Sequence, residues 1–311
     1  MDTIIVLGVI ALLLGIGVPI ACTIGAVSVL IFVLAGDAQY LAVVPQRMFS
    51  QMDVFAIMAM PLYIWAGELM NRGGITRALV DFALLLAGRI RGGLGHAAII
   101  TSVFFSGISG SAAADIAALS NTLVGQMRQR GYDPLYAGAL TAAASVIGPI
   151  IPPSIIMILY GAILSTDVAA LFMAGIVPGL LIAAALMALN AWMAHREGHP
   201  GGTAADVPEW RPTLARALPA LSLPAVILGG IVFGIMTPIE AGAIAVVAAA
   251  GLGWWYEELD LESFIDSTRK AIVLSGVLFL FIAAGAASSY LIALSQVAEH
   301  IVAGGGKRLR P

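Results

Sequence analysis

Two short stretches of this chain carry oxygen atoms that could bind a cation. Ser106–Asp115 has three serines and two glycines in its first six residues, and Gly148–Ser154 has a double proline near its end. A hard cation such as Na⁺ prefers hydroxyl, carboxylate and carbonyl oxygens, and carbonyls are free for it only where a helix is broken. Both stretches therefore predict an ion site built on unwound backbone.

The candidate ligands differ between the two stretches. The first offers the hydroxyls or carbonyls of Ser106, Ser109 and Ser111. The second offers the carbonyls of Gly148, Ile151 and Pro153, because Pro152 and Pro153 have no amide hydrogens to satisfy them locally. A half-helix that begins near Ser154 would direct its positive end to the same place and could favour an anion. The alternative is that the small residues serve only tight helix packing. The two stretches together favour the functional interpretation.

Two acidic residues need separate interpretations. Asp115 follows the serines by one turn, and it could either act in the site or bind the amides of a helix end. Glu240 follows Thr237 and Pro238 in the pattern of a capping acid, which predicts a structural role for Pro238 and Glu240. His195 and His199 have no third ligand nearby, so we expect no metal other than Na⁺ and no organic cofactor.

The composition indicates the environment of these stretches. The 311 residues are 60% hydrophobic and only 11% charged, with a mean hydropathy of +0.99, whereas soluble domains contain about 25% charged residues. The chain is therefore expected to be an all-α polytopic membrane protein. Basic residues are scattered rather than gathered in a stripe, so nucleic acid is not an expected partner.

The charge pattern predicts a re-entrant hairpin over 93–127. Arg89 and Arg91 precede it, Arg128 and Arg130 follow it, and the positive-inside rule places both flanks in the cytoplasm. Each arm would be about 17 residues, or about 25 Å of helix, which is too short for a comfortable span. We expect the turn at Ser106–Ser111, near the middle of the membrane.

The other elements follow from apolar runs and proline breaks. The run 4–35 predicts two short helices that meet near Pro19, and 134–164 predicts one span broken at the double proline. The remaining predictions are an interfacial arm at 37–53, a span at 54–70, a surface helix at 75–90, a span at 168–193, a cytoplasmic loop at 195–217, a broken pair at 218–236 and 239–256, a second arm at 257–270 and a last span at 271–294.

An internal repeat is also predicted. Gly15–Ala21 resembles Gly234–Glu240 at an offset of 219, and each is followed by an apolar helix, a polar arm and another span. An odd number of crossings would invert the second unit, as in many secondary transporters. This divides the chain into 1–194, the loop 195–217 and a partial second repeat at 218–311. The same offset places a second hairpin and broken helix beyond residue 311, so we expect a truncated chain that does not transport by itself.

One enzyme hypothesis is weak. Gly107–Gly110 reads G-x-S-G, the nucleophile motif of rhomboid-type intramembrane proteases. A serine nucleophile needs a base within hydrogen-bond reach, and the later histidines fall at span ends or in the polar loop. We therefore expect no enzymatic activity.

The combination of these motifs resembles the large membrane subunit of tripartite ATP-independent periplasmic (TRAP) transporters. Three stretches carry the resemblance, which runs from residue 1 to about 300: Ser106–Asp115, Gly148–Ser154 and Thr237–Ala241. It implies an elevator-type, Na⁺-coupled permease of the bacterial inner membrane. The implied partners are a small four-helix membrane subunit and a periplasmic binding protein that delivers organic acids such as dicarboxylates or sialic acid.

The same resemblance implies specific roles for the site residues. A sodium ion would be held by Ser106, Ser109, Gly148, Ile151 and Pro153, and the site would be lined by Ser111, Asp115, Pro152 and Ser154. Two other hypotheses stay open: a different Na⁺-coupled carrier such as a divalent anion/sodium symporter, and a non-transporting membrane fragment. The substrate cannot be chosen from this chain.

Overall fold

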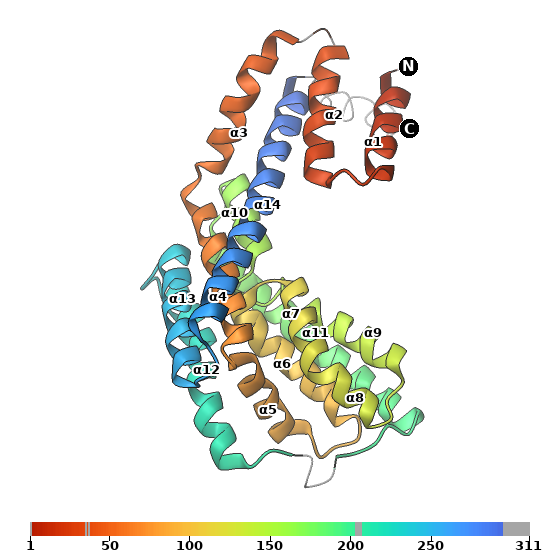
Figure 1. Ribbon diagram of the computed structural model, residues 1–311, viewed down its shortest axis with the longest axis vertical. Coiled ribbons are helices and arrows are strands. Elements are labelled where there is room, and N and C mark those ends of the chain that lie inside the picture. Colours follow the sequence, from red (N-terminus) through yellow and green to blue (C-terminus); the bar gives the residue numbers. More distant parts are fainter. Residues whose placement is uncertain (1, 35, 37, 203–206, 295–311) are drawn as a thin grey trace, which may run out of the picture. The chain divides into compact units, whose positions relative to one another are not determined.

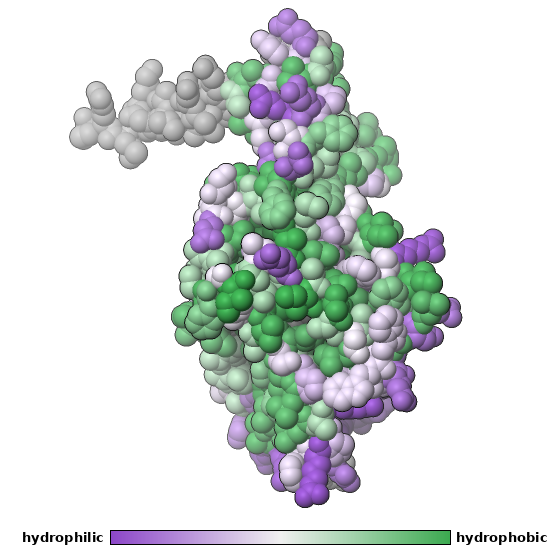
Figure 2. All heavy atoms as spheres, turned by 90° about the vertical axis from the view of Figure 1, so that its left-hand side faces the viewer, coloured by the Kyte–Doolittle hydropathy of each residue, from purple (hydrophilic) through white to green (hydrophobic). Residues whose placement is uncertain are grey.

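The computed structural model describes residues 2–34, 36, 38–202 and 207–294. All named elements in these ranges are helices, and four of them are long and apolar enough to cross a membrane. These four are α11 (Val168–Arg196), α12 (Trp210–Val232), α13 (Pro238–Trp255) and α14 (Leu261–Leu294). The predicted all-α polytopic membrane fold is confirmed. Figure 2 shows hydrophobic residues over much of the face in view, as expected of a surface that meets lipid.

The chain forms two units. The first unit comprises residues 1–54 and 273–311, and the second comprises residues 55–272. The predicted repeat boundaries describe a different property, sequence symmetry, and they stay a prediction.

The first unit holds two short N-terminal helices (Figure 1). As predicted, the apolar run breaks before Pro19 into α1 (Asp2–Gly15) and α2 (Ile20–Leu34). The interfacial arm becomes η1 (Ala38–Val43) and α3 (Val44–Met52). Phe32 is fully buried and packs against Tyr290 of α14, with ring centroids 5.9 Å apart.

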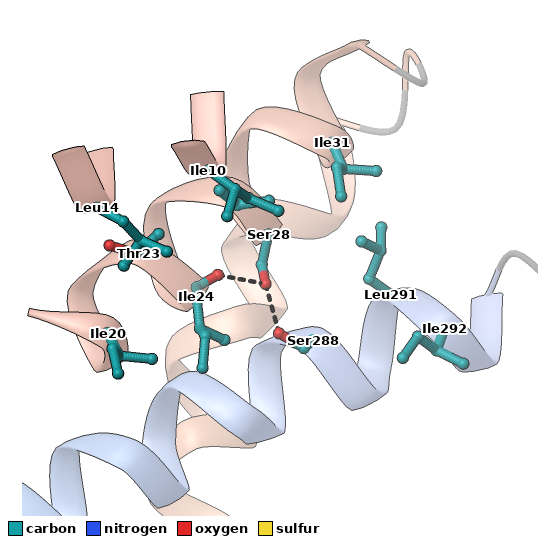
Figure 3. Close-up of a pocket in the computed structure, with 11 residues that line it drawn as sticks. Ile10, Leu14, Ile20, Thr23, Ile24, Ser28, Ile31, Ser288, Leu291 and Ile292 are labelled. Atoms are coloured by element: carbon teal, nitrogen blue, oxygen red, sulfur yellow. Dashed lines mark hydrogen bonds between the residues drawn. The ribbon is translucent and has the colours of Figure 1, made fainter. Parts of the chain in front are cut away.

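An apolar cavity of about 300 Å³ lies between α1, α2 and α14 in this unit (Figure 3). Isoleucine, leucine and valine side chains line most of it. Its polar lining residues are Thr23, Ser28 and Ser288. The hydroxyls of Ser28 and Ser288 form a 2.7 Å hydrogen bond, and Ser28 also donates to the Ile24 carbonyl. This satisfies the Ser28 hydroxyl within an apolar environment.

The second unit begins with η2 (Phe55–Met58), α4 (Ala59–Arg72) and α5 (Ile75–Ala87). Helices α4 and α13 pack closely, since a Cβ added to Gly73 would lie 2.9 Å from the Gly253 Cα. Helix α5 packs against α12 and against the predicted hairpin. Helix α4 packs against α13 and also contacts α6 and α7 of the hairpin, whereas α10 contacts η2 and α4 (Figure 1).

Two predicted boundaries were wrong. Helix α12 begins at Trp210, inside the range predicted as a loop, and the guanidinium of Arg211 lies over the Trp210 ring, so the polar residues are accommodated on the first helical turn. The predicted arm at 257–270 is not a separate element, because α14 runs without a break from Leu261 to Leu294. No proline or glycine between 261 and 275 interrupts the helix there.

Candidate functional site

The predicted hairpin is present and its tip is glycine. Helix α6 (Gly93–Ser109) ends where Gly110 adopts a left-handed conformation, with φ of +57°, and donates its N–H to the Ser106 carbonyl. The chain then returns through α7 (Ala112–Leu119), η3 (Ser120–Val124) and α8 (Gly125–Gln129), and α6 contacts both α7 and α8 (Figure 1). The turn therefore falls within the predicted Ser106–Ser111.

Both ends of the hairpin meet at one place. The backbone of Arg91 pairs with Gly201, and the neighbouring Gly202 lies next to the Arg130 guanidinium. Tyr132, just past the second arm, and Leu94, at the start of the first arm, are buried in the same apolar cluster. The entry and the exit of the hairpin are thus adjacent, which is the geometry of a re-entrant segment.

The second predicted element is broken where the prolines are. Helix α9 (Pro134–Ser145) ends before the break, and α10 (Ile155–Leu164) begins after it. Ser154 connects the two sides, because its hydroxyl donates to the Pro149 carbonyl at 2.7 Å and accepts from the Met157 N–H at 3.3 Å. The hydroxyl of Ser154 is therefore committed to capping α10.

The hairpin tip and the broken helix pack against each other at two points. A Cβ added to Gly110 would lie 2.5 Å from the Pro153 carbonyl oxygen and 3.0 Å from the Ile155 nitrogen. A Cβ added to Gly148 would lie 2.7 Å from Oδ2 of Asp115. Two glycines thus allow the backbone of each element to approach the other. We call this contact, Ser106–Asp115 against Gly148–Ser154, the tip–break junction.

The predicted serines occupy different positions in this junction. Ser106 is fully buried, and its hydroxyl donates to the Ser102 carbonyl one turn earlier. Ser109 is the last residue of α6, and its side chain lies outside the described part of the structure. Ser111 precedes α7 with an extended backbone. All three lie within one turn of the tip.

The predicted carbonyl ligands lie in the break itself. Gly148, Ile151, Pro152 and Pro153 are all buried. Among the residues that the structure describes, no backbone N–H donates to the carbonyls of Gly148, Ile151 or Pro153. These oxygens can accept from or coordinate another group, as an alkali cation requires.

Helix α11 packs against the break through residues that the sequence analysis did not single out. A Cβ added to Gly175 would overlap the Ile150 carbonyl oxygen, and a Cβ added to Gly179 would overlap the Ile151 side chain. The two glycines are spaced as Gly-x-x-x-Gly, a pattern that lets helix backbones approach closely in membranes, and this spacing was readable in the sequence.

A buried asparagine near the base of the hairpin was also missed. Asn190 of α11 is fully buried, donates to the Gly92 carbonyl at 3.1 Å and accepts from the Tyr136 hydroxyl at 2.6 Å. It therefore connects α11, the start of the hairpin and the start of the broken helix. An asparagine within an apolar run could have been read as a polar cross-link between helices.

Pro238 and Glu240 lie at the start of α13. The Thr237 N–H donates to Glu240 Oε2 at 2.7 Å, and the Glu240 N–H donates back to the Thr237 hydroxyl, which forms a capping box. These residues border a cavity of about 440 Å³ that Asp167 and Phe55 also line. None of the predicted sodium ligands lines this cavity.

Comparison with known proteins gives the chain its family. Residues 7–303 match the model for the DctM component of tripartite ATP-independent periplasmic transporters. The protein YgiK of Salmonella typhimurium, itself uncharacterised, is 36% identical over 96% of this chain and 69% of its own length. The sialic acid TRAP transporter permease SiaT of Haemophilus influenzae is 37% identical over 92% of this chain and 46% of its own.

Other relatives agree with this match. The large permease SiaM of Vibrio cholerae, named for sialic acid, is 34% identical over 91% of this chain and 66% of its own length. The chain thus spans between 46% and 69% of the length of these three relatives. SiaT and SiaM are named as TRAP transporter permeases, which are transport proteins rather than enzymes. The chain belongs to the DctM component family of tripartite ATP-independent periplasmic transporters.

Proposed function

We propose that this chain is the permease component of a Na⁺-coupled transporter that imports an organic acid. The tip–break junction carries the proposal. It brings the hydroxyl-bearing tip and the carbonyls of Gly148, Ile151 and Pro153 together at a place buried among apolar helices. Carbonyl and hydroxyl oxygens on broken helices are what a desolvated alkali cation needs.

The proposed Na⁺ ligands are Ser106, Ser109, Gly148, Ile151 and Pro153. Ser106 keeps its hydroxyl proton on the Ser102 carbonyl, so its oxygen lone pairs stay available to a cation. Ser111, Asp115, Pro152 and Ser154 would line the site without being ligands. The other Na⁺-coupled carriers considered above gain no specific support from the geometry.

The substrate class and the partners come from the family. Two relatives are named for sialic acid and one for C4-dicarboxylates, and all three names describe TRAP transporter permeases. We infer a carboxylate substrate, a periplasmic binding protein that delivers it, a small membrane subunit and a location in the bacterial inner membrane. The lipid bilayer surrounds the apolar helices.

Direct binding of ²²Na⁺ to the detergent-purified chain tests the ion site. We expect saturable binding that excess NaCl displaces and KCl does not, and that Ser106→Ala weakens. Ser28→Ala is the matched control, because Ser28 is also buried and also donates to a carbonyl one turn earlier, but belongs to the first unit. Equal loss in both variants, or no saturable binding, would contradict the proposed site.

Transport is tested in proteoliposomes that contain a small membrane subunit, a periplasmic binding protein and a large permease of the relatives' length that carries this sequence. We expect uptake of a labelled organic acid that requires both the binding protein and an inward Na⁺ gradient, and no uptake when the 311-residue chain is used as the permease. Uptake that persists when Na⁺ is replaced by K⁺ would contradict Na⁺ coupling, and uptake without the binding protein would contradict the three-component assignment.

A further inference from the structure

Asp115 is the only acidic residue of the hairpin and the broken helix. Residues 93–127 and 134–164 contain no other aspartate or glutamate and no lysine or arginine, and His96 is their only other readily charged side chain. His96 lies in the first turn of α6, about ten residues from the tip. The single formal negative charge of these elements is therefore the carboxylate of Asp115.

The structure places this carboxylate at the junction and away from solvent. Asp115 lies in the first turn of α7 and is fully buried. Its Oδ2 and Cγ lie 2.7 and 3.2 Å from the Cβ position of Gly148, so the carboxylate packs against the backbone of the break. Gly148 and its neighbours carry the carbonyls that would bind the cation.

A charge at this position has a specific consequence for a cation. The candidate ligands, hydroxyls and carbonyls, are all neutral, so they compensate only part of the cost of taking Na⁺ out of water. A carboxylate held nearby in a medium of low dielectric constant adds a favourable Coulomb term and leaves the site neutral overall. The same term stabilises the ionised carboxylate when the cation is bound.

A purely structural role makes a different prediction. An acidic residue in the first turn of a helix interacts favourably with the helix dipole whether or not an ion is present. Such a residue contributes to the stability of the ion-free protein and leaves the affinity for Na⁺ unchanged. The two roles can therefore be separated by measuring stability and affinity in the same variants.

We propose that Asp115 is a positioning residue for the ion. Its carboxylate supports the Gly148 backbone and supplies the negative charge that sets the affinity for Na⁺, without being one of the ligands. This inference rests on the proposed Na⁺ site and adds to it the origin of its charge balance.

The test is the thermal stability of the detergent-purified full chain as a function of NaCl, with ionic strength held constant by choline chloride. Ligand that binds only the folded state raises the melting temperature, so the titration gives an apparent affinity. We expect Asp115→Asn to retain the ion-free melting temperature within a few degrees and to weaken Na⁺ binding by about tenfold or more.

A second pair of variants separates charge from shape. Asp115→Glu keeps the charge, so its dissociation constant for Na⁺ should stay within about threefold of that of the unmodified chain. Asp115→Gln has a side chain of the same size as Asp115→Glu but no charge, and it should bind Na⁺ as weakly as Asp115→Asn. Asp133→Asn controls for net charge, because Asp133 is an exposed capping residue of α9 and its replacement should leave the affinity unchanged.

The outcomes distinguish this proposal from the proposed function. If the unmodified chain shows no Na⁺-specific stabilisation, the ion site itself is wrong. If it does and Asp115→Asn binds Na⁺ normally but melts at a lower temperature, Asp115 has only a structural role. Two other results would also overturn the assignment: equal loss of Na⁺ affinity in Asp115→Glu and Asp115→Gln, or failure of every Asp115 variant to fold.

Discussion

At the residue scale, two glycines determine whether the junction can form. Gly110 has a left-handed backbone and no space for a side chain, because the Pro153 carbonyl and the Ile155 nitrogen occupy the position of its Cβ. Gly148 is restricted by the Asp115 carboxylate instead. The atoms next to Gly110 belong to the backbone, which cannot move aside easily. A substitution at Gly110 should therefore destabilise the protein more than one at Gly148.

Gly110→Ala should destabilise the protein by about 2 kcal/mol or more, because the left-handed conformation and the backbone clash each cost about 1 kcal/mol or more. The measurement is thermal unfolding in detergent. Gly125→Ala is the control, since Gly125 of α8 has open space around its Cβ position, and should be neutral or stabilise by roughly 0.5–1 kcal/mol. The same loss in both variants would argue against the packed tip.

Asn190 gives a second prediction at this scale. Asn190→Ala leaves the buried Gly92 carbonyl and Tyr136 hydroxyl without this partner and should cost about 2–3 kcal/mol, and Tyr136→Phe should cost about 1 kcal/mol. The double variant should cost less than the sum, because both changes remove the same hydrogen bond. If the free-energy losses of the two single variants add up to that of the double variant, the two side chains do not interact.

At the element scale, the conformation of the broken helix depends on packing against another helix, α11. The break keeps one helical hydrogen bond, from the Ile151 N–H to the Ile147 carbonyl, and Ser154 binds the carbonyl of Pro149 and the amide of Met157. Helix α11 supplies the remaining restraint by packing Gly175 and Gly179 against Ile150 and Ile151. The position of the candidate carbonyls is therefore set by contact between two elements.

Gly175→Ala should displace the break, because its new methyl group would overlap the Ile150 carbonyl. We expect a loss of about 1–3 kcal/mol in unfolding free energy and weaker ²²Na⁺ binding. Gly251→Ala in α13 has no neighbour within 4 Å of the new Cβ, so it should leave ion binding unchanged and be neutral or stabilise by roughly 0.5–1 kcal/mol. Normal ion binding in Gly175→Ala would show that α11 does not position the ligands.

At the scale of the whole second unit, the hairpin must enter and leave on one side of the membrane. Arg91 and Arg130 lie next to the adjacent residues Gly201 and Gly202, and that segment follows the end of α11. Helix α11 has 29 residues and is long and apolar enough to cross a bilayer, so we expect Asp167 at its start to lie on the opposite side.

Labelling of single cysteines with a membrane-impermeant maleimide tests this topology in a Cys22→Ser background, because Cys22 is the only cysteine. Arg89→Cys and Arg128→Cys, at the two ends of the hairpin, should both be labelled in inverted vesicles. Ile235→Cys, which is exposed between α12 and α13, should be labelled only in right-side-out vesicles. Labelling of Arg89→Cys and Arg128→Cys from opposite sides would mean that the segment crosses the membrane.

The sequence by itself determined the membrane environment, the position of the hairpin turn and the position of the helix break. Hydropathy, basic flanks and proline act locally, through the cost of burying charge and the loss of amide donors, so each can be read without knowing the neighbours. Local signals did not settle the start of α12 or the continuity of α14, because polar residues fit on an exposed first turn.

Only the tertiary structure decided which elements meet. The approach of Gly110 to Pro153, the packing of Asp115 on Gly148 and the support from Gly175 and Gly179 join residues that are far apart in sequence. Their separations run from 25 positions (Gly175–Ile150) to 43 positions (Gly110–Pro153). Contacts of this kind depend on shape complementarity between helices, and a single sequence shows small residues without showing their partners. The sequence thus located both halves of the junction, and the fold brought them together.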